Sequence, residues 1–432
     1  MVAKPRSRLL ATYRKMTSIA EPLAARLLRQ RLAQGKEDED RLPERLGRPG
    51  RVRPKGPLIW VHAASVGESV SVLPLIRELG RLRPDAAVLV TTGTVTSGRM
   101  MVERLPQNAF HQFVPVDTPS AVRAFLDYWR PSLALWVESE LWPNMLFETK
   151  ERGIPVALVN ARMSESSFRN WKRAKRAAEE LLDSFDICLA QDDDVADKLT
   201  KLGAKHVEVP GNLKLVGDAL PYDAEVLTAL RSAIGSRPKL LWASTHEGEE
   251  QLAAFTHRDL AAQIPRLLTI IVPRHPKRGP QIAASLEGLF RVARRSNGEL
   301  PAADTELYVA DTLGELGVFY RLCPLAVMGG SFVPHGGQNP LEPARLGAAV
   351  LSGPHIDNFR EIFRLLVAGG GAEVLNSNDK LTERARFLLD NDIETMQRGQ
   401  AAAAVAGSKE PLVRTFEFLA PYLRTLDANA RA

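Results

Sequence analysis

The sequence predicts an α/β protein built on two parallel sheets, and three observations support this class. Short apolar runs alternate with helical patterns along most of the 432 residues, which is typical of parallel strands covered by helices. The alternation loosens between residues 209 and 238 and then restarts, so we expect two halves of the same kind. Polar residues follow several of the apolar runs, where such sheets bind their ligands. The predicted fold is therefore two doubly wound, Rossmann-like halves.

Composition places the chain among soluble globular proteins long enough for two domains. Hydrophobic residues make up 45% and charged residues 25% of the sequence, which excludes a disordered or fibrous protein. The two cysteines, Cys188 and Cys323, lie far apart inside apolar runs and form no metal-ligand pattern. They are typical of small buried side chains in a reducing compartment.

The expected strands set the domain boundaries. They are residues 58–62, 87–91, 133–137, 155–159 and 187–190 in the first half, and 240–243, 268–272, 307–310, 325–328 and 349–351 in the second. We place the first Rossmann-like domain at 57–215 and the second at 216–432, with a central cleft between them. The last helical stretch, 412–423, could pack back on the first domain.

The first 56 residues are expected to form a basic arm and a linker. Residues 1–55 contain 15 Lys and Arg against 6 Asp and Glu, although the whole chain carries a net charge of only +6. Residues 34–56, rich in charge, Gly and Pro, are typical of a linker. Before them, apolar residues at helical spacing between basic ones predict an amphipathic helix, broken near Pro22. These apolar residues are Leu9, Leu10, Tyr13, Met16, Ile19, Leu23, Leu27 and Leu28.

The arm favours contact with an anionic membrane surface. No apolar window of 18 or more residues occurs, so we expect no transmembrane helix, and the longest apolar run of the opening is too short for a secretory signal. A nucleic-acid protein would spread basic and aromatic residues over a binding face, so no nucleic-acid partner is expected. A basic amphipathic helix suits a membrane surface. Packing of the helix on the protein's own surface is the alternative.

Three residues of the first half are candidate catalytic groups. Glu68 follows the first strand, where a carboxylate can take a proton from a hydroxyl, but its spacing from Ser65 also fits helix capping. Glu138 ends another buried strand and needs a cation or hydroxyl as partner, for which Lys214 is the candidate. A structural ion pair is the alternative for these two residues.

Two segments that follow strands of the second half are suited to a nucleotide. Arg274 can bind a phosphate with two nitrogen atoms, and His275 can donate to a phosphate or ribose oxygen. Gly314, Glu315 and Leu316 begin another helix, where backbone groups could contact a base edge. If this half is Rossmann-like, these residues surround one nucleotide-sized pocket.

The Gly-rich stretch 327–358 predicts a strand, a flexible loop, a helix start and a short strand. Its loop leads to the helix start at Asn339-Pro340-Leu341-Glu342, so free backbone N–H groups and a helix N-terminus are expected for a phosphate. Asn339 fits the N-cap, Pro340 the first helical position and Glu342 the third, so a capping box that only starts a helix is the alternative. No dinucleotide fingerprint, P-loop or zinc-protease motif occurs, and we expect no metal site and no cofactor.

Seven motifs occur in order from about residue 58 onward: HAASVGE, VESELWPN, NARMS, GNLK, VPRHPKR, DTLGEL and GGSFVPHGGQNPLEP. Together they resemble the bacterial 3-deoxy-D-manno-octulosonic acid (Kdo) transferases, membrane-associated glycosyltransferases that attach Kdo to the lipid A precursor. The resemblance implies a GT-B fold, with the acceptor lipid on the N-terminal domain and CMP-Kdo on the C-terminal one. We expect inverting, metal-independent transfer in lipopolysaccharide biosynthesis.

The resemblance also implies a role for each candidate residue. Glu68 would be the general base, and Glu138 and Lys214 would stabilise the transition state. CMP would be held by Arg274, His275, Gly314, Glu315, Leu316, Asn339, Pro340, Leu341 and Glu342, with Glu342 accepting from the ribose hydroxyls. The alternatives are a GT-B enzyme for another nucleotide sugar, such as a UDP-sugar transferase or epimerase, and a lipid-binding relative without catalysis.

The N-terminus departs from the resemblance. Members of that family commonly begin with a hydrophobic anchoring helix, whereas this chain begins with the broken basic segment. We therefore expect peripheral or N-terminally anchored attachment to the cytoplasmic face of the inner membrane.

Overall fold

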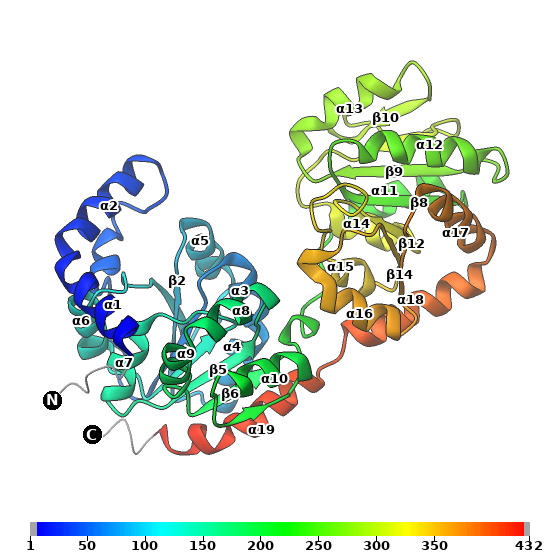
Figure 1. Cartoon of the computed structure of the whole chain (residues 1–432). Helices are drawn as coiled ribbons and strands as arrows, with labels where there is room; N and C mark the ends of the chain where they lie inside the picture. The colour runs from blue at the N-terminus through cyan, green and yellow to red at the C-terminus, as the bar shows by residue number, and fades with distance from the viewer. Residues whose placement is uncertain (1–6, 427–432) are drawn as a thin grey trace. The chain divides into compact units, whose positions relative to one another are not determined.

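Two compact units make up the protein, and each is built on one parallel sheet. The computed structural model describes residues 7–426 (Figure 1). The first unit contains the chain up to Val216 and again from Lys409, and the second contains Gly217–Ser408. Each sheet has seven strands, and the paired strands are parallel. The predicted α/β class with two Rossmann-like halves is confirmed.

The first sheet has the strand order β3-β2-β1-β4-β5-β6-β7. Its strands are β1 (Leu58–His62), β2 (Ala87–Thr92), β3 (Ala109–Phe113), β4 (Leu133–Val137), β5 (Val156–Ala161), β6 (Ile187–Ala190) and β7 (Val207–Glu208). Its helices are α1 (Arg8–Ile19), α2 (Glu21–Ala33), α3 (Val66–Ser71), α4 (Leu73–Leu82), α5 (Val95–Arg104), α6 (Pro119–Trp129), α7 (Pro143–Glu151), α8 (Glu165–Arg173), α9 (Lys175–Leu182), α10 (Asp193–Lys201) and α19 (Glu410–Arg424), with 3-10 helices η1 (Leu42–Leu46) and η2 (Leu213–Leu215).

Alternating residues of the strands in the first unit pack in two separate hydrophobic cores, one on each face of the sheet. Leu58 and Trp60 of β1 pack in one cluster with side chains of α6, α7, α9 and α10. Ile59 and Val61 pack in the other with side chains of α4 and α19. Because every residue of β1 and β4 is buried, these strands read as continuous apolar runs in the sequence.

The second sheet has the order β10-β11-β9-β8-β12-β13-β14. Its strands are β8 (Lys239–Thr245), β9 (Leu268–Pro273), β10 (Val292–Arg294), β11 (Leu307–Val309), β12 (Leu325–Met328), β13 (Ala349–Ser352) and β14 (Ala372–Val374). Its helices are α11 (Ala224–Ile234), α12 (Glu249–Ala261), α13 (Gly279–Leu286), α14 (Leu316–Leu322), α15 (Leu341–Ala344), α16 (Arg360–Ala368), α17 (Asn378–Asp390) and α18 (Asp392–Ala406), with 3-10 helices η3 (Pro276–Arg278), η4 (Arg295–Asn297) and η5 (Asp357–Phe359).

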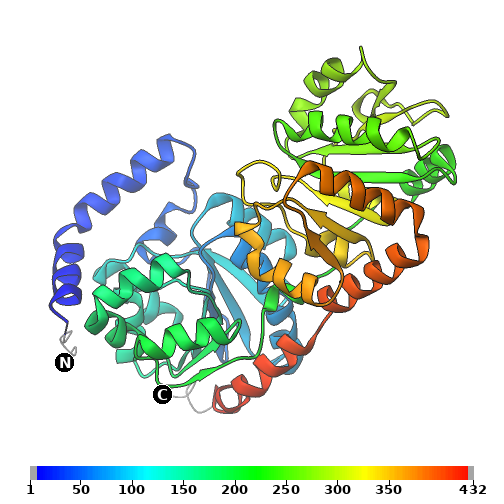
Figure 2. The ribbon, with the colours of Figure 1, turned by 45° about the vertical axis from the view of Figure 1, so that its right-hand side comes forward.

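The final helix, α19, belongs to the first unit, although the chain reaches it from the second. Leu419, Leu423 and Leu426 are buried in the core formed by one face of the first sheet. The red helix in Figure 2 therefore completes a hydrophobic core that begins some 360 residues earlier in the chain, at Ile59.

The N-terminal arm is a pair of helices, α1 and α2, that meet at Ala20 next to Pro22 (Figure 2). One side packs on the first unit: Leu10 and Leu28 are buried, and Arg14 forms an ion pair of 2.7 Å with the buried Glu148. The other side exposes an apolar stripe composed of Leu9, Met16, Ile19, Leu23 and Leu27. Both uses foreseen for the amphipathic pattern are thus visible, packing on the protein and an exposed apolar face.

Much of the segment predicted as a linker is instead packed on edge strand β3. Buried Glu44 accepts a hydrogen bond from the backbone N–H of Phe113 (2.7 Å). Arg41 binds Glu44 and lies over the ring of Phe113, 4.5 Å from its centroid. The charges that suggested a loose segment are therefore used to cover a strand edge.

Among the described residues, no helix is long and apolar enough to cross a membrane.

Candidate functional site

Glu68 lies in the first turn of α3, directly after the carboxyl end of β1. Its backbone N–H donates to Ser65 Oγ (3.3 Å), and its carboxylate accepts from Ser65 Oγ (2.8 Å) and from the N–H of Ala64 (2.8 Å). The expected capping geometry is therefore present. Burial raises the pKa of Glu68 above its ordinary value, and the nearby carboxylates of Glu140 and Glu138 raise it further, against the hydrogen bonds that lower it.

Glu138 and Lys214 form the expected ion pair, at 2.7 Å between Nζ and Oε1. The Glu138 side chain is only 7% exposed and that of Lys214 is 27% exposed, so the pair lies largely within the first unit. Glu138 follows β4 with a positive φ of 59°, a conformation that is strained for a residue with a side chain. Strain of this kind is most often found at functional sites, where the surrounding structure enforces it.

A buried amide network holds the turn that carries Lys214. The Asn160 Oδ1 accepts from the N–H of Leu213 (2.9 Å), and Asn212 Oδ1 accepts from the N–H of Lys214 (2.9 Å). Gln191 links the two, because its Nε2 donates to the carbonyl of Asn160 and its Oε1 accepts from Asn212 Nδ2. Lys214 is thereby tied to the ends of β5 and β6, next to the strand that carries Glu138.

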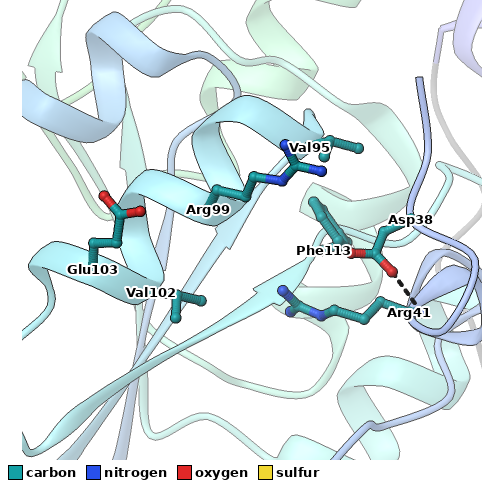
Figure 3. Close-up of a pocket in the computed structure, with 7 residues that line it drawn as sticks. All are labelled: Asp38, Arg41, Val95, Arg99, Val102, Glu103 and Phe113. Carbon is teal, nitrogen blue, oxygen red and sulfur yellow. Dashed lines mark hydrogen bonds between the residues drawn. The ribbon is translucent and has the colours of Figure 1, made fainter. Parts of the chain in front are cut away.

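A cavity of about 270 Å³ lies beyond strand β3, between the 34–56 segment and α5 (Figure 3). Arg99 reaches it from α5 and Arg41 from the packed segment, with Phe113 between them. Asp38 and Glu103 also line it, so its charges nearly cancel. This cavity was not foreseen from the sequence, and its mixed charge does not select one class of ligand.

In the second unit, Arg274 and His275 follow β9, and both side chains are exposed. Two further imidazoles accompany them: the rings of His246 and His335 stack at 4.1 Å, and His275 lies edge-on to His246 at 6.2 Å. Gln338 contacts His246 Nε2 at 3.0 Å. Burial lowers the pKa of His246, and the neighbouring His335, His275 and Arg274 lower it further. This end of the second sheet therefore concentrates groups that bind anions.

The expectation of free backbone N–H groups in the Gly-rich loop is wrong for its first part. The N–H groups of Gly330, Ser331 and Phe332 donate to the carboxylate of Glu249, at 2.6–3.0 Å. Glu249 is completely buried and also accepts from the N–H of His246 (2.9 Å). A carboxylate of the protein itself thus occupies the place where a phosphate was expected.

The helix after this loop is only one turn long, because α15 spans Leu341–Ala344. Asn339 Oδ1 accepts from the N–H of Leu341 (3.2 Å), and Asn339 Nδ2 approaches Glu342 Oε1 at 3.4 Å. Pro340 is therefore the N-cap, Asn339 precedes it, and Glu342 is the second helical residue. The predicted capping box, with Asn339 as N-cap and Glu342 in the third position, is wrong by one position. Burial raises the pKa of Glu342, whereas Asn339 and the nearby Arg274 lower it. Arg274 and Glu342 are thus brought close to each other.

Gly314, Glu315 and Leu316 lie at the start of α14, as the sequence predicts. Gly314 has a φ of 84°, which suits glycine. The Glu315 carboxylate accepts hydrogen bonds from Nε and Nη2 of Arg295, at 2.9 and 2.7 Å, which lowers the pKa of Glu315. Its side chain is therefore engaged within the protein.

The predicted residues form two groups, one in each unit. Glu68, Glu138 and Lys214 lie at the carboxyl ends of adjacent strands of the first sheet or are tied to them. The nine predicted CMP residues follow strands β9, β11 and β12 of the second sheet, whose carboxyl ends share one edge because the strands are parallel. Sequence reasoning missed the organising role of Asn160, Gln191 and Glu249. An acidic residue in the first turn of α12 was the available signal for Glu249.

The architecture of two units, each on a parallel sheet, also occurs among solved structures. A UDP-GlcNAc 2-epimerase from Neisseria meningitidis has the same fold, with a TM-score of 0.58 over 84% of this chain and 100% of that one, although only 14% of residues are identical. The family model of 3-deoxy-D-manno-octulosonic-acid transferase (kdotransferase) matches residues 40–216.

Sequence similarity to named relatives extends over most or nearly all of the chain. It is 34% identical to the 3-deoxy-D-manno-octulosonic acid transferase of Haemophilus influenzae over 427 residues, 95% of this chain and 98% of the relative. It is 37% identical to that of Bordetella pertussis over 404 residues, 89% and 90% of the two chains. The protein belongs to the 3-deoxy-D-manno-octulosonic acid transferase family and is a glycosyltransferase.

Proposed function

We propose that the protein transfers Kdo from CMP-Kdo to the lipid A precursor in lipopolysaccharide biosynthesis, by inverting displacement. The observation that carries this proposal is the position of Glu68, a half-buried carboxylate with a raised pKa beside the Glu138–Lys214 pair. A carboxylate whose pKa is raised is a stronger base than an ordinary one.

In the reaction, Glu68 accepts the proton of a glucosamine primary hydroxyl as its oxygen attacks the anomeric carbon of Kdo. The bond from that carbon to the phosphate oxygen breaks, and CMP leaves with the electron pair. Lys214, held by Glu138, supplies a fixed positive charge that stabilises the charge developing on the reacting groups.

CMP-Kdo would bind to the second unit. Arg274 and His275 face the phosphate, and the exposed imidazole cluster adds donors for its oxygen atoms. Glu342 accepts from the ribose hydroxyls, since a second anion beside the phosphate would be unfavourable. Because the Gly330–Phe332 N–H groups are taken by Glu249, side chains and not this first part of the loop supply the phosphate contacts.

The protein would work at the cytoplasmic face of the inner membrane, attached through its arm. The exposed apolar stripe of α1 and α2 lies among exposed Arg8, Lys15, Arg26 and Arg29. Apolar side chains can enter the boundary of the bilayer while basic ones bind anionic head groups.

Turnover of CMP-Kdo with a tetraacylated glucosamine disaccharide bisphosphate tests the function. The wild-type protein should form the Kdo-linked product, and Glu68→Ala should abolish it while CMP still raises the melting temperature of the second unit. Glu140→Gln, which removes a neighbouring carboxylate that no step uses, should keep activity. Full turnover by Glu68→Ala would remove the proposed base, and stabilisation by UDP in preference to CMP would favour a UDP-sugar enzyme.

A further inference from the structure

A small pocket with both apolar and polar walls opens beside Glu138 in the first unit. It has a volume of about 70 Å³ and lies between β5 and helices α8, α9 and α10. Six apolar side chains line it: Leu141, Leu158, Met163, Trp171, Leu182 and Leu199. Glu138, Ser139, Arg162 and Ser167 complete the lining as polar groups. The apolar part of this lining is suited to hydrocarbon.

The surface around the pocket is strongly basic. Helix α8 has no buried residue, and its Arg169, Lys172 and Arg173 are exposed, as is Arg162 before it. Among the residues that the structure describes, none of these four has an ion-pair partner. The acidic residue of α8, Glu165, is within 3.3 Å of Lys198 instead. Arg162 in the lining and three cations on the helix that supplies Ser167 and Trp171, beside a partly apolar pocket, indicate a ligand with both an anionic and an apolar part.

We propose that this pocket receives an acyl chain of the acceptor, with an acceptor phosphate on the basic side chains of α8. The assignment rests on the proposed function and adds where the acceptor is held. The pocket shares Glu138 with the Glu138–Lys214 pair, and the Glu138 charge acts on Glu68, so a chain bound in the pocket lies close to the proposed catalytic residues.

The size of the pocket limits what it can take. Its volume of about 70 Å³ is roughly half of the ~150 Å³ cavity that holds benzene, so it has room for a few methylene groups and not for a whole chain. The pocket therefore contacts one short segment of one acyl chain. The remaining chains of a tetraacylated acceptor stay outside it, in the membrane.

A bulky substitution at the opening of the pocket tests the proposed contact with an acyl chain. Ser167→Phe places a ring into the opening, and Ser166→Phe adds the same ring on the neighbouring exposed position, which does not line the pocket. Ser167→Phe should raise KM for the acylated acceptor by roughly tenfold, the effect of losing contact with two methylene groups. Its kcat/KM for the deacylated disaccharide bisphosphate should match wild type, and Ser166→Phe should behave as wild type with both.

Equal losses with the acylated and deacylated acceptors, or an unchanged KM for the acylated one, would overturn the pocket assignment. If neither acceptor receives Kdo from the wild-type protein, the proposed function fails first.

A binding experiment without donor distinguishes failure of the pocket assignment from failure of the proposed function. An acceptor brominated on its acyl chains, in unbrominated detergent micelles, should quench the fluorescence of Trp171, and Trp171→Phe should remove that part of the quenching. No quenching that depends on Trp171 would place the chains elsewhere.

The phosphate contact is tested on the same helix. Lys172→Gln together with Arg173→Gln should weaken binding of the deacylated bisphosphate by roughly tenfold at low salt and reduce its dependence on salt. Lys175→Gln is the matched control, because Lys175 is already within 3.7 Å of Glu179. If the control weakens binding as much as the double variant, the effect is one of general charge and the assignment to α8 is wrong.

Discussion

Glu68 combines a structural and a chemical task in one carboxylate. Ser65 Oγ donates a hydrogen bond to Oε1 of Glu68, and the N–H of Ala64 donates one to Oε2. These two hydrogen bonds fix the position of the carboxylate. Each oxygen has a second lone pair, which remains able to accept a proton. Because capping fixes the base in place at the carboxyl end of β1, the two uses of this residue support each other.

The raised pKa of Glu68 predicts the pH dependence of transfer. The base must be deprotonated, so kcat/KM should fall as the pH drops through the pKa of Glu68, and this acidic limb should lie above the range of an ordinary Glu. Glu140→Gln removes one of the charges that raise this pKa, so the acidic limb should move to lower pH. A pH profile of kcat/KM for wild type and Glu140→Gln measures both, and an unmoved limb would show that another group titrates.

Variants of the Glu138–Lys214 pair are expected to show that its contribution to stability differs from its contribution to activity. Lys214→Met leaves a buried carboxylate without its cation, which should cost about 1–3 kcal/mol after allowance for the partial exposure of Lys214. In the double variant Glu138→Gln with Lys214→Met, the unpaired charge is gone and most of that stability should return. Activity should stay at least about a hundredfold below wild type in both variants.

Denaturant unfolding and turnover of the three proteins check this prediction. If the double variant regains activity along with stability, the pair serves only the fold.

At the scale of elements, the central strands were predictable and the edge strands were not. All ten predicted strands are present, whereas β3, β7, β10 and β14 were missed. These four are the edges of the two sheets. Central strands are covered on both faces and carry continuous apolar runs, but edge strands are short or mix in polar residues, as in AFHQF of β3.

The site was predictable where a residue acts through its own type and position. Glu68, Glu138 and Arg274 follow strands and could be found from that placement. The occupation of the Gly-rich loop by Glu249 could not, because Glu249 lies about 80 residues before the loop and only the parallel pairing of β8 with β12 brings them together. Long-range pairing of this kind leaves no local pattern in the sequence.

Glu249 yields a prediction for the loop that it holds. Glu249→Gln replaces an oxygen acceptor by an NH₂ donor that faces backbone N–H groups, which should destabilise the second unit by about 2–3 kcal/mol. The corresponding loss in melting temperature is roughly 5–10 °C. CMP binding should weaken as well, because the Gly330–Phe332 turn leads to His335.

Differential scanning calorimetry and CMP titration measure the two effects. Glu247→Gln, on the exposed side of the same turn, should leave both unchanged. Unaltered stability and CMP affinity in Glu249→Gln would show that the turn holds its shape without this carboxylate.

At the scale of the whole molecule, the chain ends share the first unit. The arm packs on it through Leu10 and Arg14, and α19 returns to complete its core. The first unit thus carries the candidate base, the pocket for an apolar chain and the exposed apolar stripe. All the features suited to a lipid acceptor are therefore found in one unit.

The apolar stripe predicts reversible attachment to membranes. Met16, Ile19 and Leu23 are 58–71% exposed, and replacing all three by Ser should weaken binding to anionic phospholipid vesicles by roughly a hundredfold. The matched control replaces Ile393, Met396 and Val413 by Ser, because these side chains are 55–69% exposed but lie outside the arm.

Cosedimentation with vesicles measures the binding of both variants. Turnover of a deacylated acceptor should be unchanged in the arm variant, since the stripe faces away from the packed side of the arm that touches the first unit. Equal loss of vesicle binding in both variants would mean that general surface hydrophobicity, and not the arm, attaches the protein.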